Sequence, residues 1–239
     1  MTDKIKIKEI FDSIQGEGPY VGEKQLFVRT TKCNLNCKYC DTDFLCDENS
    51  KGYNFDEFFE ILKSSDAQTV SFTGGEPLLE ADFLFEFFKR YKNRLNKKIY
   101  LETNGTNAKN LKKIIDYVDI VSMDIKLKSA TGLEFSLITF DDFLNIAKEK
   151  EVFAKVVFDE NISNSEIIEV TTLAKKYGIL LILQPKMPIS STLNIDEIFE
   201  KVNPSGKSDM GKIMKEANAL LKGKADMKTV NEIVMSKLK

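Results

Sequence analysis

The chain has 239 residues, of which 42% are hydrophobic and 30% are charged, and its formal net charge is −2. This length is enough for one α/β domain with a sizeable core, and the charge gives no broad electrostatic reason to bind nucleic acid or an anionic membrane. The first ten residues alternate charged residues with isoleucine, so we expect no signal peptide. No apolar run approaches the length of a membrane span.

Segments with strand character alternate with segments with helix character almost to the end of the chain. A first strand is expected over residues 4–11, before a glycine-rich break at residues 15–19. Helices are marked by apolar residues at helical spacing and by capping residues, such as Asn54 and the pair Ser163 and Glu166. Six further strands are expected over residues 26–30, 69–73, 98–103, 120–125, 152–158 and 180–183.

The order of these elements predicts an α/β fold, a partial (β/α)6 TIM-like barrel. A helix or a cysteine-rich loop separates each of the six strands from the next, and such alternation indicates parallel strands joined by right-handed crossovers. Six units fall short of the eight of a closed barrel. The lysine-rich region from Ile195 onward predicts two or three C-terminal helices, and without a linker or repeat we expect a single domain over residues 1–239.

Three of the four cysteines fall within the eight residues that follow the second strand. Cys33, Cys37 and Cys40 have the spacing Cys-x3-Cys-x2-Cys, which lets three thiolates converge on one metal cluster and leaves one metal position open. A zinc site needs a fourth ligand, and the chain has no His and only Cys46 in addition. A zinc site with a distant ligand and reduced core thiols stay open as alternatives. Clustered thiols also favour a reducing, cytoplasmic location.

Polar residues and glycines follow the ends of the expected strands. In α/β barrels the carboxyl ends of the strands meet on one face and carry the reacting groups. We therefore expect a single active site there, with residues from all six strands. The strand-end positions are Arg29, Thr73, Gly74, Gly75, Glu76, Glu102, Asn104, Asp124, Lys126, Lys155 and Gln184.

The cysteine spacing, with an aromatic residue before the last cysteine, and the segment Gly-Gly-Glu-Pro at residues 74–77 resemble the motifs of radical S-adenosylmethionine (SAM) enzymes. The resemblance implies a radical SAM fold, a 4Fe–4S cluster on the three cysteines, and SAM on the fourth iron. It also implies an electron donor such as flavodoxin or ferredoxin. The residues expected to contact SAM are Tyr39, Asp41, Gly74, Gly75, Glu76, Asn104, Ser122, Asp124, Lys126 and Gln184.

Three further motifs resemble those of the 7-carboxy-7-deazaguanine synthase family: FDSIQGEG at residues 11–18, Asp-Thr after Cys40, and ETNGT at residues 102–106. The resemblance implies ring contraction of 6-carboxy-5,6,7,8-tetrahydropterin to 7-carboxy-7-deazaguanine with release of ammonia. This is a lyase step of 7-deazapurine (queuosine or archaeosine) biosynthesis, which supplies a precursor for tRNA modification. The resemblance also implies a Mg2+ ion bound with the help of Thr42, and a homodimer.

The residues themselves fit a planar, anionic pterin. Arg29 is one of only three arginines, and its planar fork suits a carboxylate at the end of a core strand. Gln15 and Glu17 can supply the donors and acceptors that a pterin edge requires. Mg2+ takes a few oxygen ligands beside its waters, so the Thr42 hydroxyl and the substrate carboxylate can share the ion. The residues expected to contact the substrate are Ile14, Gln15, Gly16, Glu17, Arg29 and Thr73.

Two other functions stay open from the sequence. A radical SAM activase, which makes a glycyl radical on a partner protein, shares the cysteine loop, the Gly-Gly-Glu-Pro segment and the Asp-Ile-Lys segment at residues 124–126. A non-catalytic iron–sulfur or zinc module would leave the strand-end polar residues without a role. Members of the synthase family often carry Gln-x-His-Lys near the C-terminus, and because this chain has no His, no site residue is expected there.

Overall fold

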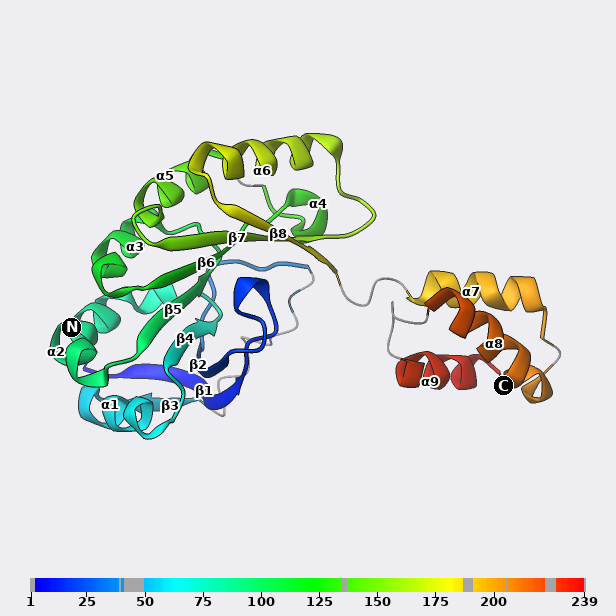
Figure 1. Ribbon diagram of the computed structural model, residues 1–239, viewed down its shortest axis with the longest axis horizontal. Helices are drawn as coiled ribbons and strands as arrows, with labels where there is room; N and C mark the ends of the chain where they lie inside the picture. The colour runs from blue at the N-terminus through cyan, green and yellow to red at the C-terminus, as the bar shows by residue number, and fades with distance from the viewer. Residues whose placement is uncertain are drawn as a thin grey trace. The chain divides into compact units, whose positions relative to one another are not determined.

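The computed structural model describes residues 3–38, 40, 50–134, 137–186, 191–204, 206–221 and 227–238. The chain forms two compact units, Met1–Pro185 and Lys186–Lys239 (Figure 1). Among the described residues, no helix combines the length and apolar character that crossing a membrane would require.

The first unit is built on one eight-stranded sheet with the strand order β3-β1-β2-β4-β5-β6-β7-β8 (Figure 1). Its six parallel strands are β2 (Lys24–Thr30), β4 (Thr69–Gly74), β5 (Lys98–Thr103), β6 (Ile120–Asp124), β7 (Glu151–Phe158) and β8 (Leu180–Pro185). They confirm the predicted set of six parallel strands. Two antiparallel strands, β1 (Ile5–Ile14) and β3 (Lys51–Tyr53), extend the sheet beyond β2. The sequence did not predict β3, because three residues are too few to show a strand period.

Helices connect the parallel strands. They are α1 (Phe55–Ser64), α2 (Ala81–Leu95), α3 (Ala108–Ile114), α4 (Lys128–Thr131), α5 (Leu137–Ala147) and α6 (Asn164–Tyr177), with 3-10 turns at Gly18–Tyr20, Pro77–Glu80 and Ile115–Tyr117. Both expected capping signals form. The Asn54 side chain accepts hydrogen bonds from two backbone N–H groups of α1, and Ser163 and Glu166 make a reciprocal capping box at α6.

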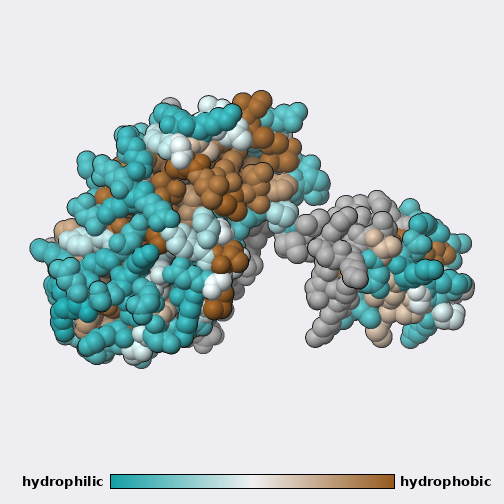
Figure 2. All heavy atoms as spheres, in the orientation of Figure 1, coloured by the Kyte–Doolittle hydropathy of each residue, from teal (hydrophilic) through white to brown (hydrophobic). Residues whose placement is uncertain are grey.

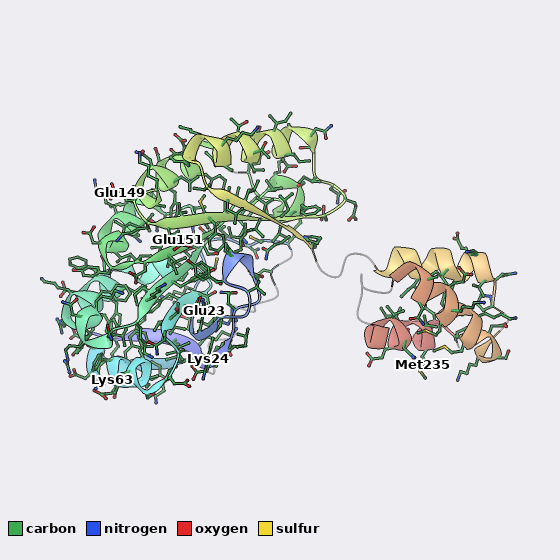
Figure 3. All side chains as sticks on the ribbon, viewed as in Figure 1. Glu23, Lys24, Lys63, Glu149, Glu151 and Met235 are labelled. Atoms are coloured by element: carbon green, nitrogen blue, oxygen red, sulfur yellow. The ribbon has the colours of Figure 1, made fainter. Side chains whose placement is uncertain are left out.

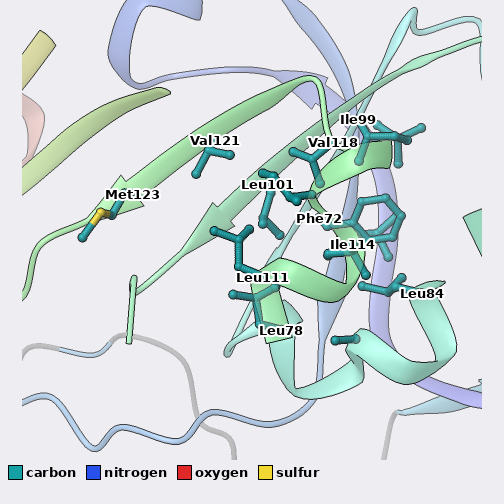
Figure 4. Packing of buried hydrophobic residues seen from close by; sticks show 14 of the residues in the cluster. Phe72, Leu78, Leu84, Ile99, Leu101, Leu111, Ile114, Val118, Val121 and Met123 are labelled. Carbon is teal, nitrogen blue, oxygen red and sulfur yellow. The ribbon is translucent and has the colours of Figure 1, made fainter. Parts of the chain in front are cut away.

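The hydrophobic core lies between one face of the sheet and these helices (Figure 4). Phe72, Leu101 and Val121 point from β4, β5 and β6 toward Leu84 of α2 and Leu111 of α3. Each such side chain contributes about 1.5–3 kcal/mol when fully buried. Because side chains alternate along a strand, the residues between them point to the opposite face of the sheet. We call this opposite face the inner face.

The second unit contains α7 (Ser191–Val202), a 3-10 turn at Lys207–Asp209, α8 (Met210–Leu221) and α9 (Met227–Lys237). Helices were expected in this region. The expectation of one domain over residues 1–239 differs from the structure, because these helices bury their apolar residues against one another in a cluster of their own. That cluster consists of Ile195, Ile198, Ile213, Ala217, Val230, Val234 and Leu238.

Candidate active site

The register of the sheet places polar side chains side by side on the inner face. Arg29 is the register partner of Thr73, and Glu102 is the partner of Ser122. Farther along the sheet, Asp124 is the partner of Lys155. The carboxyl ends of β2, β4, β5 and β6 thus meet at this face, where the sequence predicted the active site, whereas Lys155 lies in the middle of β7.

The loop of residues 15–23, between β1 and β2, is held against this inner face. The Gln15 side chain is buried and donates from Nε2 to Glu102 Oε1 at 3.1 Å and to Gln25 Oε1 at 3.3 Å. Its Oε1 accepts from the backbone N–H of Glu17 at 3.1 Å. The Gln15 backbone N–H donates to Glu23 O at 2.8 Å and closes the loop. Two residues predicted to contact substrate therefore lie in one ordered turn over β5.

Aromatic contacts dock the same loop on the sheet. The Tyr20 ring meets Tyr100 edge-on with a centroid distance of 5.6 Å and also contacts Phe153. Its hydroxyl donates to Glu151, at the start of β7, which Figure 3 labels. Gly18 has φ of +68°, and a β-carbon there would lie 2.6 Å from the Phe153 ring. Only glycine fits this position, which explains the last glycine of the QGEG segment.

A buried lysine joins this loop to β7. Lys155 is 5% exposed, and its Nζ lies 2.6 Å from Glu17 Oε2. Burial opposes the charge of Lys155, but the carboxylates of Glu102, Glu17 and Asp124 outweigh it and raise its pKa. Burial also works to raise the pKa of Glu17, yet Lys155, helped by Gln184, lowers it below the usual range. Both partners are therefore charged at neutral pH.

Glu102 is held through both of its carboxylate oxygens. The Thr73 hydroxyl donates to Oε2 at 2.7 Å, and Gln15 occupies Oε1. Glu102 and Lys155 were noted as strand-end residues in the sequence, but neither was assigned to the substrate. The available signal was a charged residue within an apolar strand, as in the segment EVFAKVVF of β7.

Arg29 has a protein partner that the sequence did not indicate. Its Nε lies 2.5 Å from Glu9 Oε1, and the two residues are register partners in β1 and β2. The Arg29 side chain is 27% exposed. Within the described part of the chain, the two terminal nitrogens of its guanidinium have no hydrogen-bond partner. A bidentate contact with a ligand carboxylate through these nitrogens stays available, and the carboxylate role of Arg29 remains a prediction.

The cysteine loop follows β2 directly. Cys33 and Cys37 are half-buried and Cys40 is exposed. Burial raises the pKa of the Cys33 and Cys37 thiols. Among the described residues, no group of three His, Cys, Asp or Glu is arranged as a metal site. The fit to an iron–sulfur cluster therefore rests on the chemistry of three neighbouring thiols. Residues predicted to act beside them, Tyr39, Asp41 and Thr42, and also Cys46, lie outside the described residues.

The Gly-Gly-Glu turn after β4 packs directly on the cysteine loop. Gly74 has φ of +114°, and a β-carbon on Gly75 would lie 1.9 Å from the Lys32 carbonyl oxygen. The backbone N–H of Glu76 donates to the same Lys32 oxygen at 2.7 Å. Glycine is therefore required here for the close approach of two backbones.

The Glu76 carboxyl group is fully buried, and protein groups satisfy it. It accepts hydrogen bonds from the backbone N–H groups of Leu78 and Asn104 and from the Thr103 hydroxyl, at 3.0, 2.8 and 2.8 Å. Burial raises its pKa to about 7 in spite of these donors. The side chain thus joins the turns after β4 and β5. The Glu76 backbone is also engaged, because its N–H donates to Lys32 and its carbonyl oxygen accepts from the Leu79 N–H at 3.1 Å. A SAM contact of Glu76 remains a prediction, and the second lone pair of that carbonyl oxygen is the group left to make it.

The site has two parts: the cysteine loop with the turns that pack on it, and the polar group around Lys155 on the inner face. The remaining predicted residues divide between these two parts. Asn104 donates to Asn34 Oδ1 at 2.8 Å and so joins the turn after β5 to the cysteine loop. Asp124 Oδ1 is buried without a hydrogen-bond partner among the described residues, an arrangement that favours a ligand or water. Ser122 Oγ is also buried and lies beside the Tyr100 hydroxyl. Gln184 lies beside Glu17, and its contact with SAM remains a prediction. Ile14 is 57% exposed, which gives no support to a substrate contact.

One ion pair connects the two parts. Lys126 Nζ lies 2.5 Å from Asp124 Oδ2. Its charge acts on the thiols of Cys33 and Cys37 and also on the carboxylate of Glu17. The thiol cluster and the polar group around Lys155 therefore belong to one continuous site at the carboxyl end of the sheet.

Comparison with known proteins separates the same two units. The model of the radical SAM superfamily matches residues 27–183, and the model of the Yqey-like protein family matches residues 189–238. A 7-carboxy-7-deazaguanine synthase from Geobacter sulfurreducens is 32% identical over 219 residues, which cover 81% of this chain and 86% of the relative. The synthase from Archaeoglobus fulgidus is 34% identical, and the match covers 74% of this chain and 82% of the relative. The synthase from Methanocaldococcus jannaschii is 35% identical, and the match covers 76% of this chain and 83% of the relative.

Proposed function

Since the chain belongs to the radical SAM superfamily and to the 7-carboxy-7-deazaguanine synthase family, we propose that it contracts 6-carboxy-5,6,7,8-tetrahydropterin to 7-carboxy-7-deazaguanine and releases ammonia. The observation that carries the proposal is the loop of residues 15–23, held on the inner face beside Arg29, Glu102 and Lys155. This arrangement provides charged and hydrogen-bonding groups for a small, planar, anionic molecule next to the cysteine loop.

In this proposal the thiolates of Cys33, Cys37 and Cys40 hold a 4Fe–4S cluster, and SAM binds beside it. When bound, the cluster and SAM supply the one-electron chemistry that removes a hydrogen atom from the substrate. The chain holds SAM with the backbone of residues 74–76, which packs on the cysteine loop, and with the turn that carries Asn104.

The inner face positions the substrate. The terminal nitrogens of Arg29 bind the substrate carboxylate, because a guanidinium presents two parallel donors. Gln15, Glu17 and Glu102 bind the N–H and carbonyl edge of the pterin, and Thr73 orients Glu102 by its hydrogen bond. With no His in the chain, proton movement during ammonia loss uses carboxylates, water or the substrate itself.

Further parts of the proposal concern ions and partners. We assign a Mg2+ ion to Thr42 together with substrate oxygens, an electron donor such as flavodoxin or ferredoxin, and a cytoplasmic location. We also propose a homodimer. In support, Ile168 of α6 and Leu180 and Leu183 of β8 are exposed, and Figure 2 shows apolar residues gathered over this part of the first unit.

The reaction is assigned to the first unit. The residues matched by the radical SAM model and every candidate site residue lie within residues 1–185. The product enters a 7-deazapurine pathway, leading to queuosine or archaeosine.

The test is anaerobic reconstitution of the full chain with iron, sulfide, SAM, a chemical reductant and carboxytetrahydropterin, with the deazapurine identified by mass spectrometry. We expect product only when both SAM and the pterin are present, and none from Cys33→Ala. Cleavage of SAM without any deazapurine, under conditions in which the cluster is intact, would contradict the proposed substrate.

A further inference from the structure

We propose that Lys155 is a substrate-positioning residue: its ammonium group holds the carboxylate of Glu17 on the inner face, so that the loop of residues 15–23 presents its polar edge to the pterin. This inference rests on the proposed function and deepens it. None of the sequence motifs that define the site includes Lys155.

The position of Lys155 requires an explanation. It lies in the middle of β7 between apolar residues and is the only buried lysine or arginine in the described part of the chain. A buried ammonium is costly unless it is paired and hydrogen-bonded. Its partner, Glu17, comes from a loop 138 residues earlier in the sequence, and the distance between the charged atoms is 2.6 Å.

The pair has one buried and one accessible member. The Lys155 side chain is 6% exposed, whereas the Glu17 side chain is 48% exposed. Lys155 is therefore fixed by the sheet, while Glu17 remains open to a ligand on the inner face. Gln15 in the same loop is fixed by a different strand, through Glu102 of β5. The two side chains are thus held at a defined separation, as recognition of a rigid planar edge requires.

A purely structural role for the ion pair is less well supported. The loop is already docked by the contacts of Tyr20 with Tyr100, Phe153 and Glu151. Replacing a buried ion pair by apolar residues is often neutral for stability. The loop thus has contacts to the sheet besides this pair, and the pair adds an oriented, charged Glu17 that can serve a ligand.

The surrounding charges predict a pH signature. Glu17 faces Lys155 of β7, Lys126 after β6 and Gln184 of β8, while Glu102 and Asp124 also face Lys155. In the wild type, Lys155 lowers the pKa of Glu17, so the pterin affinity should not change with pH near neutrality. In Lys155→Met, burial without this partner raises the pKa of Glu17, and the residual pterin affinity should fall as the pH is lowered.

The experiment compares wild type, Lys155→Met, Lys155→Arg, Glu17→Gln and the double variant Glu17→Gln/Lys155→Met. Each full-length, reconstituted protein is titrated with carboxytetrahydropterin and, separately, with SAM by calorimetry without reductant, and KM and kcat follow with reductant. The matched control is Lys148→Met, which removes an exposed lysine outside the site.

We expect Lys155→Met to raise the Kd and KM for the pterin about 10- to 100-fold, the effect of losing one well-oriented hydrogen bond to a charged group, and to leave the Kd for SAM unchanged. The double variant should bind the pterin no more weakly than the single variant with the lower pterin affinity, because both substitutions remove the same interaction between Lys155 and Glu17. Lys155→Arg keeps the charge and should restore part of the affinity and the flat pH profile. If Lys155→Met does not fold, Lys155→Gln makes the same test, because glutamine keeps a hydrogen-bond donor at this position and removes the charge that holds Glu17.

Unchanged pterin affinity in Lys155→Met, in an otherwise active enzyme, would overturn this inference and leave the proposed function standing. Equal weakening of pterin and SAM binding with a lowered melting temperature would also overturn it, by assigning Lys155 to the fold alone. A wild-type protein that neither binds nor converts the pterin would refute the proposed function and this inference together.

Discussion

Replacement of Arg29 by lysine separates two roles of one guanidinium. Its Nε is paired with Glu9, and its two terminal nitrogens have no partner among the described residues. Lysine keeps the positive charge but loses the planar fork. If the terminal nitrogens bind the substrate carboxylate, the variant should lose substrate affinity and keep most of its stability.

The expected magnitudes differ enough to be measured. The pair of Arg29 and Glu9 is partly exposed, with side-chain exposures of 27% and 49%, so its loss should cost about 1 kcal/mol or less. This corresponds to a decrease in melting temperature of about 2–4 °C for a chain of this size. Loss of one hydrogen bond between charged groups costs about 1.5–3 kcal/mol, which weakens pterin binding about 10- to 100-fold.

Calorimetry of pterin and SAM binding to the reconstituted variants measures the effect. Glu9→Gln is the matched control, because it removes the ion pair within the sheet and leaves the guanidinium in place. We expect Glu9→Gln to lower the melting temperature about as much as Arg29→Lys while pterin binding stays within a few-fold of wild type. The reasoning is refuted if Arg29→Lys weakens pterin and SAM binding equally, or if Glu9→Gln loses as much pterin affinity as Arg29→Lys.

Three other changes test the remaining parts of the site. Cys33→Ala should abolish the brown colour of the reconstituted cluster and SAM cleavage, whereas Cys46→Ala should keep both; the reverse result would overturn the ligand assignment. Thr42→Ala should remove the response of turnover to added Mg2+ while SAM still binds, and undiminished Mg2+ stimulation would count against this residue. Gly75→Ala places a β-carbon 1.9 Å from the Lys32 carbonyl oxygen and should abolish SAM binding. Gly16→Ala is the control: a β-carbon there has no atom within 4 Å, so this variant should bind SAM with normal affinity. Normal SAM binding by Gly75→Ala would show that the two backbones need not pack so closely.

Much of the site could be located in the sequence because its signals are local. The spacing of the three cysteines, the two adjacent glycines after a buried strand and the alternation of strands with helices each occupy short segments. The register then brings the ends of the parallel strands together, as the barrel prediction required. Gly75 shows what the motif left out, since the structure brings its backbone close to the Lys32 carbonyl oxygen of the cysteine loop.

The separate C-terminal unit was not apparent in the sequence. Helices α7, α8 and α9 have the same mixture of lysines and apolar residues that helices covering a barrel would have. The sequence pattern of these helices does not indicate whether their apolar faces pack on the sheet unit or on one another. Only the three-dimensional packing shows that Ile198, Ile213 and Val234 bury one another in a second core.

The pairing of charges was decided by tertiary structure alone. The sequence identified Arg29 and Lys155 as charged residues of otherwise apolar strands, which need a partner or a ligand, and Glu17 as a candidate contact to the pterin. It did not identify Glu9 as the partner of Arg29 or Lys155 as the partner of Glu17. Such pairs depend on strand register and on how a loop folds over the sheet, and they join residues as far as 138 positions apart. Local sequence sets which groups the chain carries to the end of each strand, and packing sets which of them meet.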